Sequence, residues 1–101
     1  MPARVRFRDD VTPLLAQHDA LLSPTAPAPA PAGLAWTGDA SLCQPWSTIG
    51  APSISLPSGV SSAGLPFALQ LAQVPGGDRR LLGAAVWCAR SLGPAKAPPL
   101  P

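Results

Sequence analysis

Proline is the residue that most constrains what this chain can fold into. The 101 residues include 15 prolines, and an alternating Ala-Pro run at 24–31 favours an extended polyproline II backbone. Because proline removes a backbone donor and disrupts helix interiors, regular structure is expected mainly between these positions. Much of the 47% apolar fraction is alanine, and aromatic residues make up only 5%. The sequence therefore predicts a thin core, marginal for a free-standing domain.

Two elements are predicted ahead of the Pro/Ala-rich connector, which we place at 24–33. Three apolar residues at i, i+3 and i+4 follow two aspartates that can act as N-caps, which predicts a helix over 10–18. The apolar run at 20–23, stopped by proline, predicts a short strand buried on both faces. Residues 1–8, which carry three arginines, are predicted to form a flexible basic N-terminus.

A short helix and a β-hairpin are predicted directly after the connector. Asp39 can cap a short helix over 40–49, which Gly50 would end. Alternating residues at 53–56 and 67–73 predict a β-hairpin, with turn residues at 59–64 between the strands.

A helical apolar stripe predicts the last element. The stripe follows Asp78, a candidate N-cap, and consists of Leu81, Leu82, Ala85, Val86, Ala89 and Leu92. Gly93 and Pro94 are expected to end this helix, and 94–101 would be a Pro-rich tail.

Charge and composition argue against several classes of function. The net charge of +2 is spread without a basic face, so we expect no nucleic-acid partner. The N-terminus lacks the apolar run of a secretory signal, and no apolar stretch approaches the roughly 20 residues that span a bilayer. Together with two cysteines that fall within predicted helices, these features predict a reduced, cytoplasmic protein without a membrane segment.

Several motifs resemble the C-terminal end of amidase signature family hydrolases. They are Asp19-Ala20-Leu21-Leu22-Ser23-Pro24-Thr25-Ala26-Pro27, Thr37-Gly38-Asp39, Pro45-Trp46-Ser47-Thr48-Ile49-Gly50-Ala51-Pro52-Ser53-Ile54-Ser55-Leu56-Pro57, Gly64-Leu65-Pro66-Phe67-Ala68-Leu69-Gln70-Leu71 and Asp78-Arg79-Arg80-Leu81-Leu82. The resemblance covers about 9–92 and implies an α/β fold in which 9–93 is the C-terminal part of an amidase domain. That part would be a partial mixed sheet with a buried strand, a short helix, a β-hairpin and a C-terminal covering helix.

The resemblance implies hydrolysis of amide carbon-nitrogen bonds by a serine nucleophile, a second serine on a cis peptide and a lysine base. No residue here matches that signature, and the only lysine, Lys96, lies in the predicted tail. A serine hydroxyl needs an adjacent base, so we predict no catalytic residue and no activity for this chain alone. Whether it is an enzyme is left open, with amidase as the class that the resemblance implies.

Two partners follow from these expectations. A small-molecule amide would bind if the catalytic region were supplied, and an open sheet edge would allow a partner chain or self-association. The alternatives are a non-enzymatic accessory protein that binds by strand addition, or a truncated inactive product.

Gln44, Trp46 and Ser47 are the candidate substrate-cleft residues, because the corresponding segment of related enzymes can line the cleft. Gln44 and Ser47 lie at i and i+3, so they can share one helix face. The alternative for Trp46 is core packing between helix and sheet.

The other residues of chemical interest favour structural roles. Ser61 and Ser62 are expected at the hairpin tip, and His18 at a helix C-terminus. Cys43 and Cys88 are interpreted as small buried apolar residues. Their spacing with His18 is not that of metal ligands, and we expect neither a metal nor a cofactor.

Overall fold

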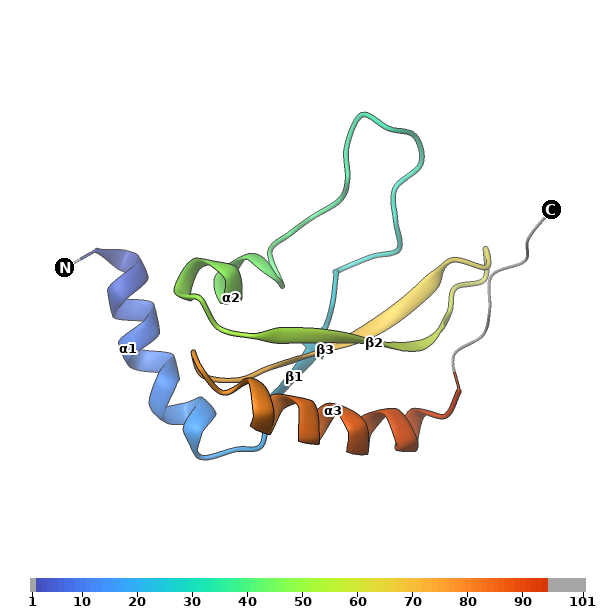
Figure 1. Cartoon of the computed structure of the whole chain (residues 1–101). Helices are drawn as coiled ribbons and strands as arrows, with labels where there is room; N and C mark the ends of the chain where they lie inside the picture. The colour runs from blue at the N-terminus through green and yellow to red at the C-terminus, as the bar shows by residue number, and fades with distance from the viewer. Residues whose placement is uncertain (1, 95–101) are drawn as a thin grey trace.

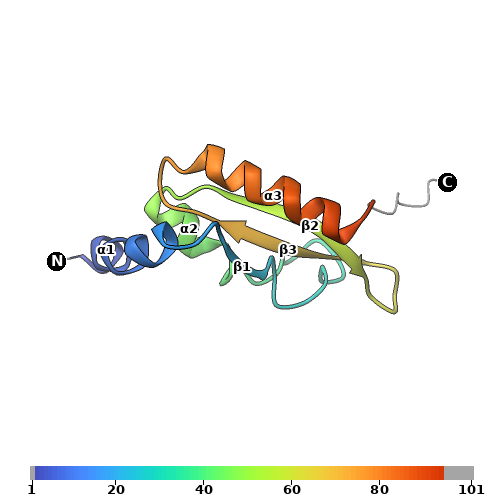
Figure 2. The same cartoon turned by 90° about the horizontal axis from the view of Figure 1, so that it is seen from below.

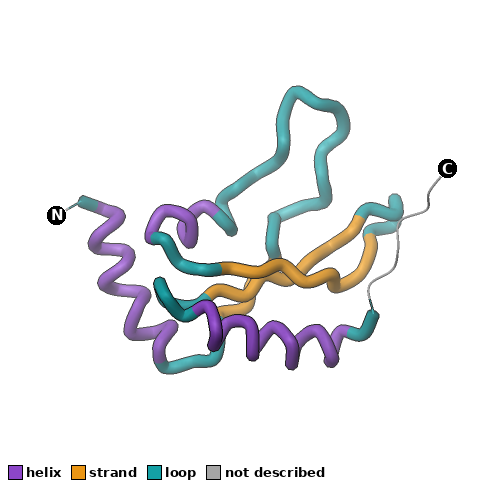
Figure 3. The backbone as a smooth tube through the Cα atoms, viewed as in Figure 1, coloured by secondary structure: helices purple, strands orange, loops and turns teal. Residues whose placement is uncertain are grey.

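The computed structural model describes residues 2–94 and contains three helices and three strands (Figure 1). In chain order these are α1 (Ala3–Ala16), β1 (Leu21–Pro24), α2 (Gln44–Ile49), β2 (Ser53–Val60), β3 (Pro66–Ala72) and α3 (Asp78–Leu92). A long segment without helix or strand joins β1 to α2 (Figure 3). The α/β fold class predicted from the sequence is confirmed.

The three strands form one sheet in the order β1-β3-β2, and both neighbouring pairs are antiparallel. The predicted hairpin is confirmed, with Ile54 opposite Leu71 and a register shift between Pro57 and Gly59. Strand β1 pairs with the other side of β3, where Leu22 lies opposite Leu71. The last strand in the sequence is therefore the central strand of the sheet.

Two small apolar clusters hold the elements together. One joins Leu15 of α1 and Trp46 and Ile49 of α2 to Ala72 of β3. The other packs Leu71 of β3 against Leu81 and Ala85 of α3. Helix α3 and the segment between β1 and α2 lie on opposite sides of the sheet (Figure 2).

Helix α1 begins well before the predicted start at residue 10, so that boundary is wrong. Residues 3–8, expected to belong to a flexible N-terminus, form its first half. The reason is an apolar stripe at i+4 spacing, in which Phe7 and Val11 pack beside the fully buried Leu15. Of the three apolar residues that predicted this helix, Val11, Leu14 and Leu15, Leu14 is exposed.

Strand β1 is confirmed close to the predicted position, but its predicted burial on both faces is wrong. Leu21 and Leu22 are exposed, with 59% of Leu22 accessible. Within the described part of the chain β1 is an edge strand, paired with β3 alone. Burial on both faces would require further layers and a further strand.

The helix boundaries after the connector follow local signals only in part. Gly50 ends α2 in the left-handed conformation, with φ 72°, as expected of a glycine stop. The helix itself begins at Gln44 rather than at residue 40, because Asp39 forms a local turn instead of a cap: its Oδ1 accepts a hydrogen bond from the Ser41 amide at 2.8 Å.

Helix α3 ends at Leu92, as predicted, but its N-cap is Gly77, and Asp78 lies in the first turn without a side-chain cap bond. Leu81 and Ala85 of the predicted stripe are buried, whereas Leu82, Val86, Ala89 and Leu92 are exposed. Residues 95–101, and with them Lys96 and most of the predicted tail, lie outside the described residues.

Candidate functional site

Helix α2 carries the three predicted substrate-cleft residues, and one of them lies in the core. Trp46 is only 7% exposed, and its ring lies 6.1 Å from that of Phe7, centroid to centroid, at an angle of 45°. Pro45, in the first turn, begins the helix without loss of an intrahelical hydrogen bond. The indole thus packs α2 against α1 and the sheet.

Gln44 and Ser47 are exposed, and the structure places them beside two different shallow hollows. Gln44 lines a hollow of about 290 Å³ together with Phe7, and Ser47 lines one of about 390 Å³. Both hollows lie between α1 and α2 and are also lined by Arg4 and Thr48. The two polar side chains therefore border one region of surface without opening into a common cavity.

A larger hollow, which the sequence did not predict, lies between the Pro/Ala connector and β3. Its volume is about 730 Å³, and it is lined by connector prolines and alanines together with Trp36, Asp39 and Phe67. Trp36 and Phe67 are both exposed. The available signal was Trp36, an aromatic residue in a segment rich in proline, alanine and glycine. The lining is mainly apolar and suits a hydrophobic group more than acid-base chemistry.

None of the serine hydroxyls among residues 2–94 is hydrogen-bonded to His18, the histidine of the described range. Ser61 Oγ accepts the Leu65 amide at 3.1 Å within the hairpin turn, as its predicted turn role requires. His18 Nδ1 donates to the Leu14 carbonyl at 2.8 Å, at the end of α1. Within residues 2–94, Ser61 and His18 are thus held by separate backbone contacts.

The cysteines do not form a bond or a metal site in the described chain. Cys43 and Cys88 are both free and half-buried, rather than fully buried as predicted. Residues 2–94 contain no group of three or more His, Cys, Asp or Glu side chains placed to hold a metal ion.

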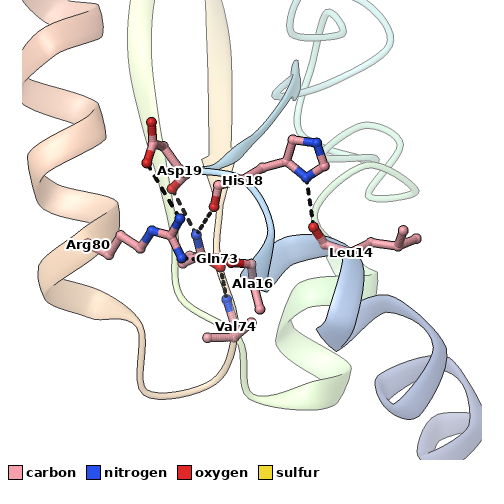
Figure 4. Close-up of polar contacts among 7 residues, drawn as sticks. All are labelled: Leu14, Ala16, His18, Asp19, Gln73, Val74 and Arg80. Atoms are coloured by element: carbon pink, nitrogen blue, oxygen red, sulfur yellow. Dashed lines mark hydrogen bonds and ion pairs between the residues drawn. The ribbon is translucent and has the colours of Figure 1, made fainter.

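A buried polar cluster joins the end of β3 to the loop after α1 (Figure 4). Gln73 is 0% exposed, and its Nε2 donates to the carbonyls of His18 and Asp19 at 2.9 and 2.8 Å. Its Oε1 accepts the Val74 amide at 2.8 Å. Arg80 of α3 reinforces the same loop, because its guanidinium donates to the Ala16 carbonyl at 3.0 Å and lies 3.5 Å from the Asp19 carboxylate. The cluster fixes β1 next to β3 and performs no evident chemistry.

Substitution of Gly77 by alanine should disturb this cluster. A Cβ at Gly77 would lie 2.8 Å from Gln73 Cγ and 3.0 Å from the Val74 carbonyl oxygen. We expect Gly77→Ala to lower the free energy of unfolding by about 1–3 kcal/mol, measured by urea denaturation followed by circular dichroism. Gly83→Ala is the matched control: its Cβ would have nothing within 4 Å, and a gain of about 0.5–1 kcal/mol is expected inside a helix. Equal stability of the two variants would show that Gly77 is not tightly packed.

None of the helices within residues 2–94 has the length and apolar character needed to cross a bilayer.

Comparisons with known proteins agree on one family. The family model described as amidase matches residues 1–82. Mandelamide hydrolase of Pseudomonas putida is 37% identical over 90 residues, which cover 81% of this chain and 18% of that hydrolase.

Solved structures give the same answer for the fold. The crystal structure of an amidase matches with a TM-score of 0.77 and 30% identity, over 89% of this chain and 23% of that one. A glutamyl-tRNA(Gln) amidotransferase subunit of Thermotoga maritima matches with a TM-score of 0.65 and 28% identity, over 77% and 18% of the two chains. The chain thus spans only about a fifth of the length of these relatives.

Proposed function

The chain belongs to the amidase family, and from this premise we propose that it forms the C-terminal part of a hydrolase that cleaves small-molecule amides. The observation that carries the proposal is the breadth of the match, which covers 81% of this chain but only 18% of mandelamide hydrolase. The chain would supply the β1-β3-β2 sheet, the covering helix α3 and part of the substrate cleft. The nucleophilic serine, its partner serine and the lysine base would come from the remaining four fifths of the enzyme.

Gln44 and Ser47 are our candidates for contact with the acyl part of the substrate. The assignment is supported by the exposure of both side chains on one short helix, which Trp46 fixes to the core. An amide side chain and a hydroxyl can both hydrogen-bond to a carboxamide without taking part in proton transfer. Trp46 is assigned an indirect role, because its burial lets it hold α2 in place.

A chimera tests this function directly. We expect mandelamide hydrolase to retain activity when its matched segment is replaced by this chain, because identity of 37% preserves the fold of the replaced part. Release of mandelic acid is the measurement, and the same chimera with its nucleophilic serine changed to alanine is the control.

Two results would contradict the proposed function. One is a chimera that unfolds cooperatively, with native-like circular dichroism, and leaves mandelamide intact. The other is hydrolysis by this chain alone, accompanied by labelling with a serine-directed fluorophosphonate.

Gln44→Ala and Ser47→Ala in an active chimera should raise KM with little change in kcat if these residues contact the substrate.

A non-enzymatic accessory role is the second candidate, favoured by the free edge of β1 and its exposed Leu21 and Leu22. The chain would then bind a partner, or a second copy, by strand addition. A well-folded monomer with cooperative unfolding in isolation would favour this reading.

Unpaired Cys43 and Cys88 are compatible in either case with a reducing compartment such as the cytoplasm.

A further inference from the structure

The hollow between the Pro/Ala connector and β3, which we call the connector hollow, combines aromatic rings with a single charge. Its volume of about 730 Å³ lies within the range of small-molecule sites. Two of its lining side chains, Trp36 and Phe67, are 63% and 43% exposed. Among the described residues that line it, Asp39 alone carries a formal charge, although the chain as a whole has a net charge of +2.

We propose that the connector hollow binds a small molecule that carries a substituted ammonium group. Such a cation is attracted both to the faces of aromatic rings and to a carboxylate, and its alkyl groups suit an apolar lining. Trp36 and Phe67 supply the rings, Asp39 supplies the carboxylate, and the connector supplies the apolar wall. The inference goes beyond the proposed function, because none of Gln44, Trp46 and Ser47 lines this hollow.

The lining argues against other small ligands. A hard metal ion such as Ca²⁺ needs about six to eight oxygen ligands, whereas Asp39 supplies the only carboxylate of the described lining. An anion would be repelled by that carboxylate and would find no arginine or lysine among the described lining residues. Asp39 also takes part in neither ion pair of the described chain, so a bound cation would be its first partner there. A weakly hydrated organic cation fits these conditions.

Hydrogen bonds to β3 fix both ends of the connector. At its start, the Thr25 amide donates to the Ala68 carbonyl at 3.1 Å. Near its end, the Leu42 carbonyl accepts a hydrogen bond from Gln70 Nε2 at 2.7 Å. The connector is therefore held over the central strand of the sheet, and the hollow between them is part of the folded structure.

The side chains that would contact the cation lie on one short stretch of the connector. Gly38, with φ 110°, brings this stretch against the proline run, because a Cβ there would lie 3.5 Å from Pro31 Cδ. Trp36 and Asp39 lie on either side of Gly38. Asp39 Oδ1 accepts the Ser41 amide at 2.8 Å, which orients the carboxylate and leaves Oδ2 for a ligand. The ring and the charge are thus placed together before any ligand binds.

The three tryptophans allow a specific test by nuclear magnetic resonance of their indole N–H groups. Trp36 lines the connector hollow, Trp46 lies in the core, and Trp87 is exposed on α3. Trp87 is the matched control, because the carboxylate beside it, that of Asp19, is already paired with Arg80 at 3.5 Å. The probe is choline chloride, added to the full chain at constant ionic strength. The neutral alcohol in which carbon replaces the nitrogen of choline is the second titrant.

We expect choline to shift the Trp36 signal with a Kd of about 1–10 mM, and the neutral alcohol to bind at least about fivefold more weakly. The Trp46 and Trp87 signals should change little. Weak binding is expected because both rings and the carboxylate are exposed to water.

Variants of the two contacting residues test the assignment without disturbing the core, since neither belongs to the two apolar clusters. We expect Asp39→Asn, which keeps an acceptor for the Ser41 amide, to weaken choline binding at least about threefold. Trp36→Ala should weaken it at least about fivefold, with the Gly38 amide as reporter, whereas Trp87→Ala should leave it within about twofold. An unchanged Trp46 signal checks that each variant is folded.

Several results would overturn the proposal. Equal binding of choline and the neutral alcohol would show that the hollow is merely apolar. An unmoved Trp36 signal at about 50 mM choline, or equal shifts of Trp36 and Trp87, would exclude a specific site. A Trp36 shift with phosphatidylcholine vesicles but not with choline would assign the hollow to a lipid surface instead. These readouts do not involve hydrolysis, so failure here leaves the proposed amidase function standing, and an inactive chimera leaves the cation site standing.

Discussion

Replacement of Trp46 by alanine is expected to lower the free energy of unfolding by about 3–5 kcal/mol, because the indole is 7% exposed in the cluster that joins α1, α2 and β3. Alanine would remove the contact with Phe7 and leave a cavity that the short helix α2 cannot close by relaxing. In a chain with so thin a core, this loss should detach α2 from the sheet. The measurement is urea denaturation followed by circular dichroism of the backbone, which does not rely on the fluorescence of the tryptophan that is replaced.

Matched variants separate this packing role from substrate contact. Gln44→Ala and Ser47→Ala alter exposed residues of the same helix and should change stability by less than about 0.5 kcal/mol. Trp46→Phe retains a ring against Phe7 and should lie between the wild-type chain and Trp46→Ala. If Trp46→Ala were as stable as the wild-type chain but raised KM in an active chimera, the indole would be a substrate contact rather than core.

Replacement of Gln73 by leucine is expected to cost about 2–4 kcal/mol. The two side chains are similar in size, so the change mainly removes hydrogen bonds. The carbonyls of His18 and Asp19 would lose a shared donor, and the Val74 amide would lose its acceptor. These contacts are part-buried, and because a polar group left unpaired there costs more than a hydrogen bond contributes net, an apolar replacement should not compensate.

Two other glutamine variants calibrate this effect, again by urea denaturation. Gln70→Leu loses one strong bond, from Nε2 to the Leu42 carbonyl at 2.7 Å, and should cost less than Gln73→Leu. Gln73→Glu retains an acceptor for Val74 but loses both donated bonds and buries a carboxylate beside the His18 and Asp19 carbonyls, so it should cost at least as much as Gln73→Leu. A stability for Gln73→Leu equal to that of the wild-type chain would show that water satisfies these carbonyls.

The elements that the sequence predicted correctly are those with local signals. Alternation along 53–56 and 67–73 identified the hairpin, and Gly50 identified the end of α2. The stripe beginning at Leu81 identified α3. Each signal lies within one helix, one turn or one pair of adjacent strands, so no contact between distant segments was required.

The errors concern contacts between distant segments. The start of α1 depends on Phe7, whose position is explained by packing against Trp46, 39 residues later. The buried state of Gln73 depends on carbonyls more than 50 residues earlier in the chain. A glutamine at the end of a strand has no local feature that distinguishes these bonds from exposure to water. For the candidate site, the sequence identified α2 and left Trp46 open between the substrate cleft and the core. The structure places Trp46 in the core and leaves Gln44 and Ser47 exposed.

The order of strands has a consequence for biosynthesis. Leu21 of β1 pairs with Ala72 of β3, so β1 emerges from the ribosome about fifty residues before the strand that it needs. At roughly 10 residues per second this delay lasts about 5 s, during which β1 cannot pair with β3. The hairpin of β2 and β3 can close first, because its strands are adjacent in sequence. Nascent β1 is therefore the segment at which ribosome-associated chaperones would bind, or premature aggregation would begin.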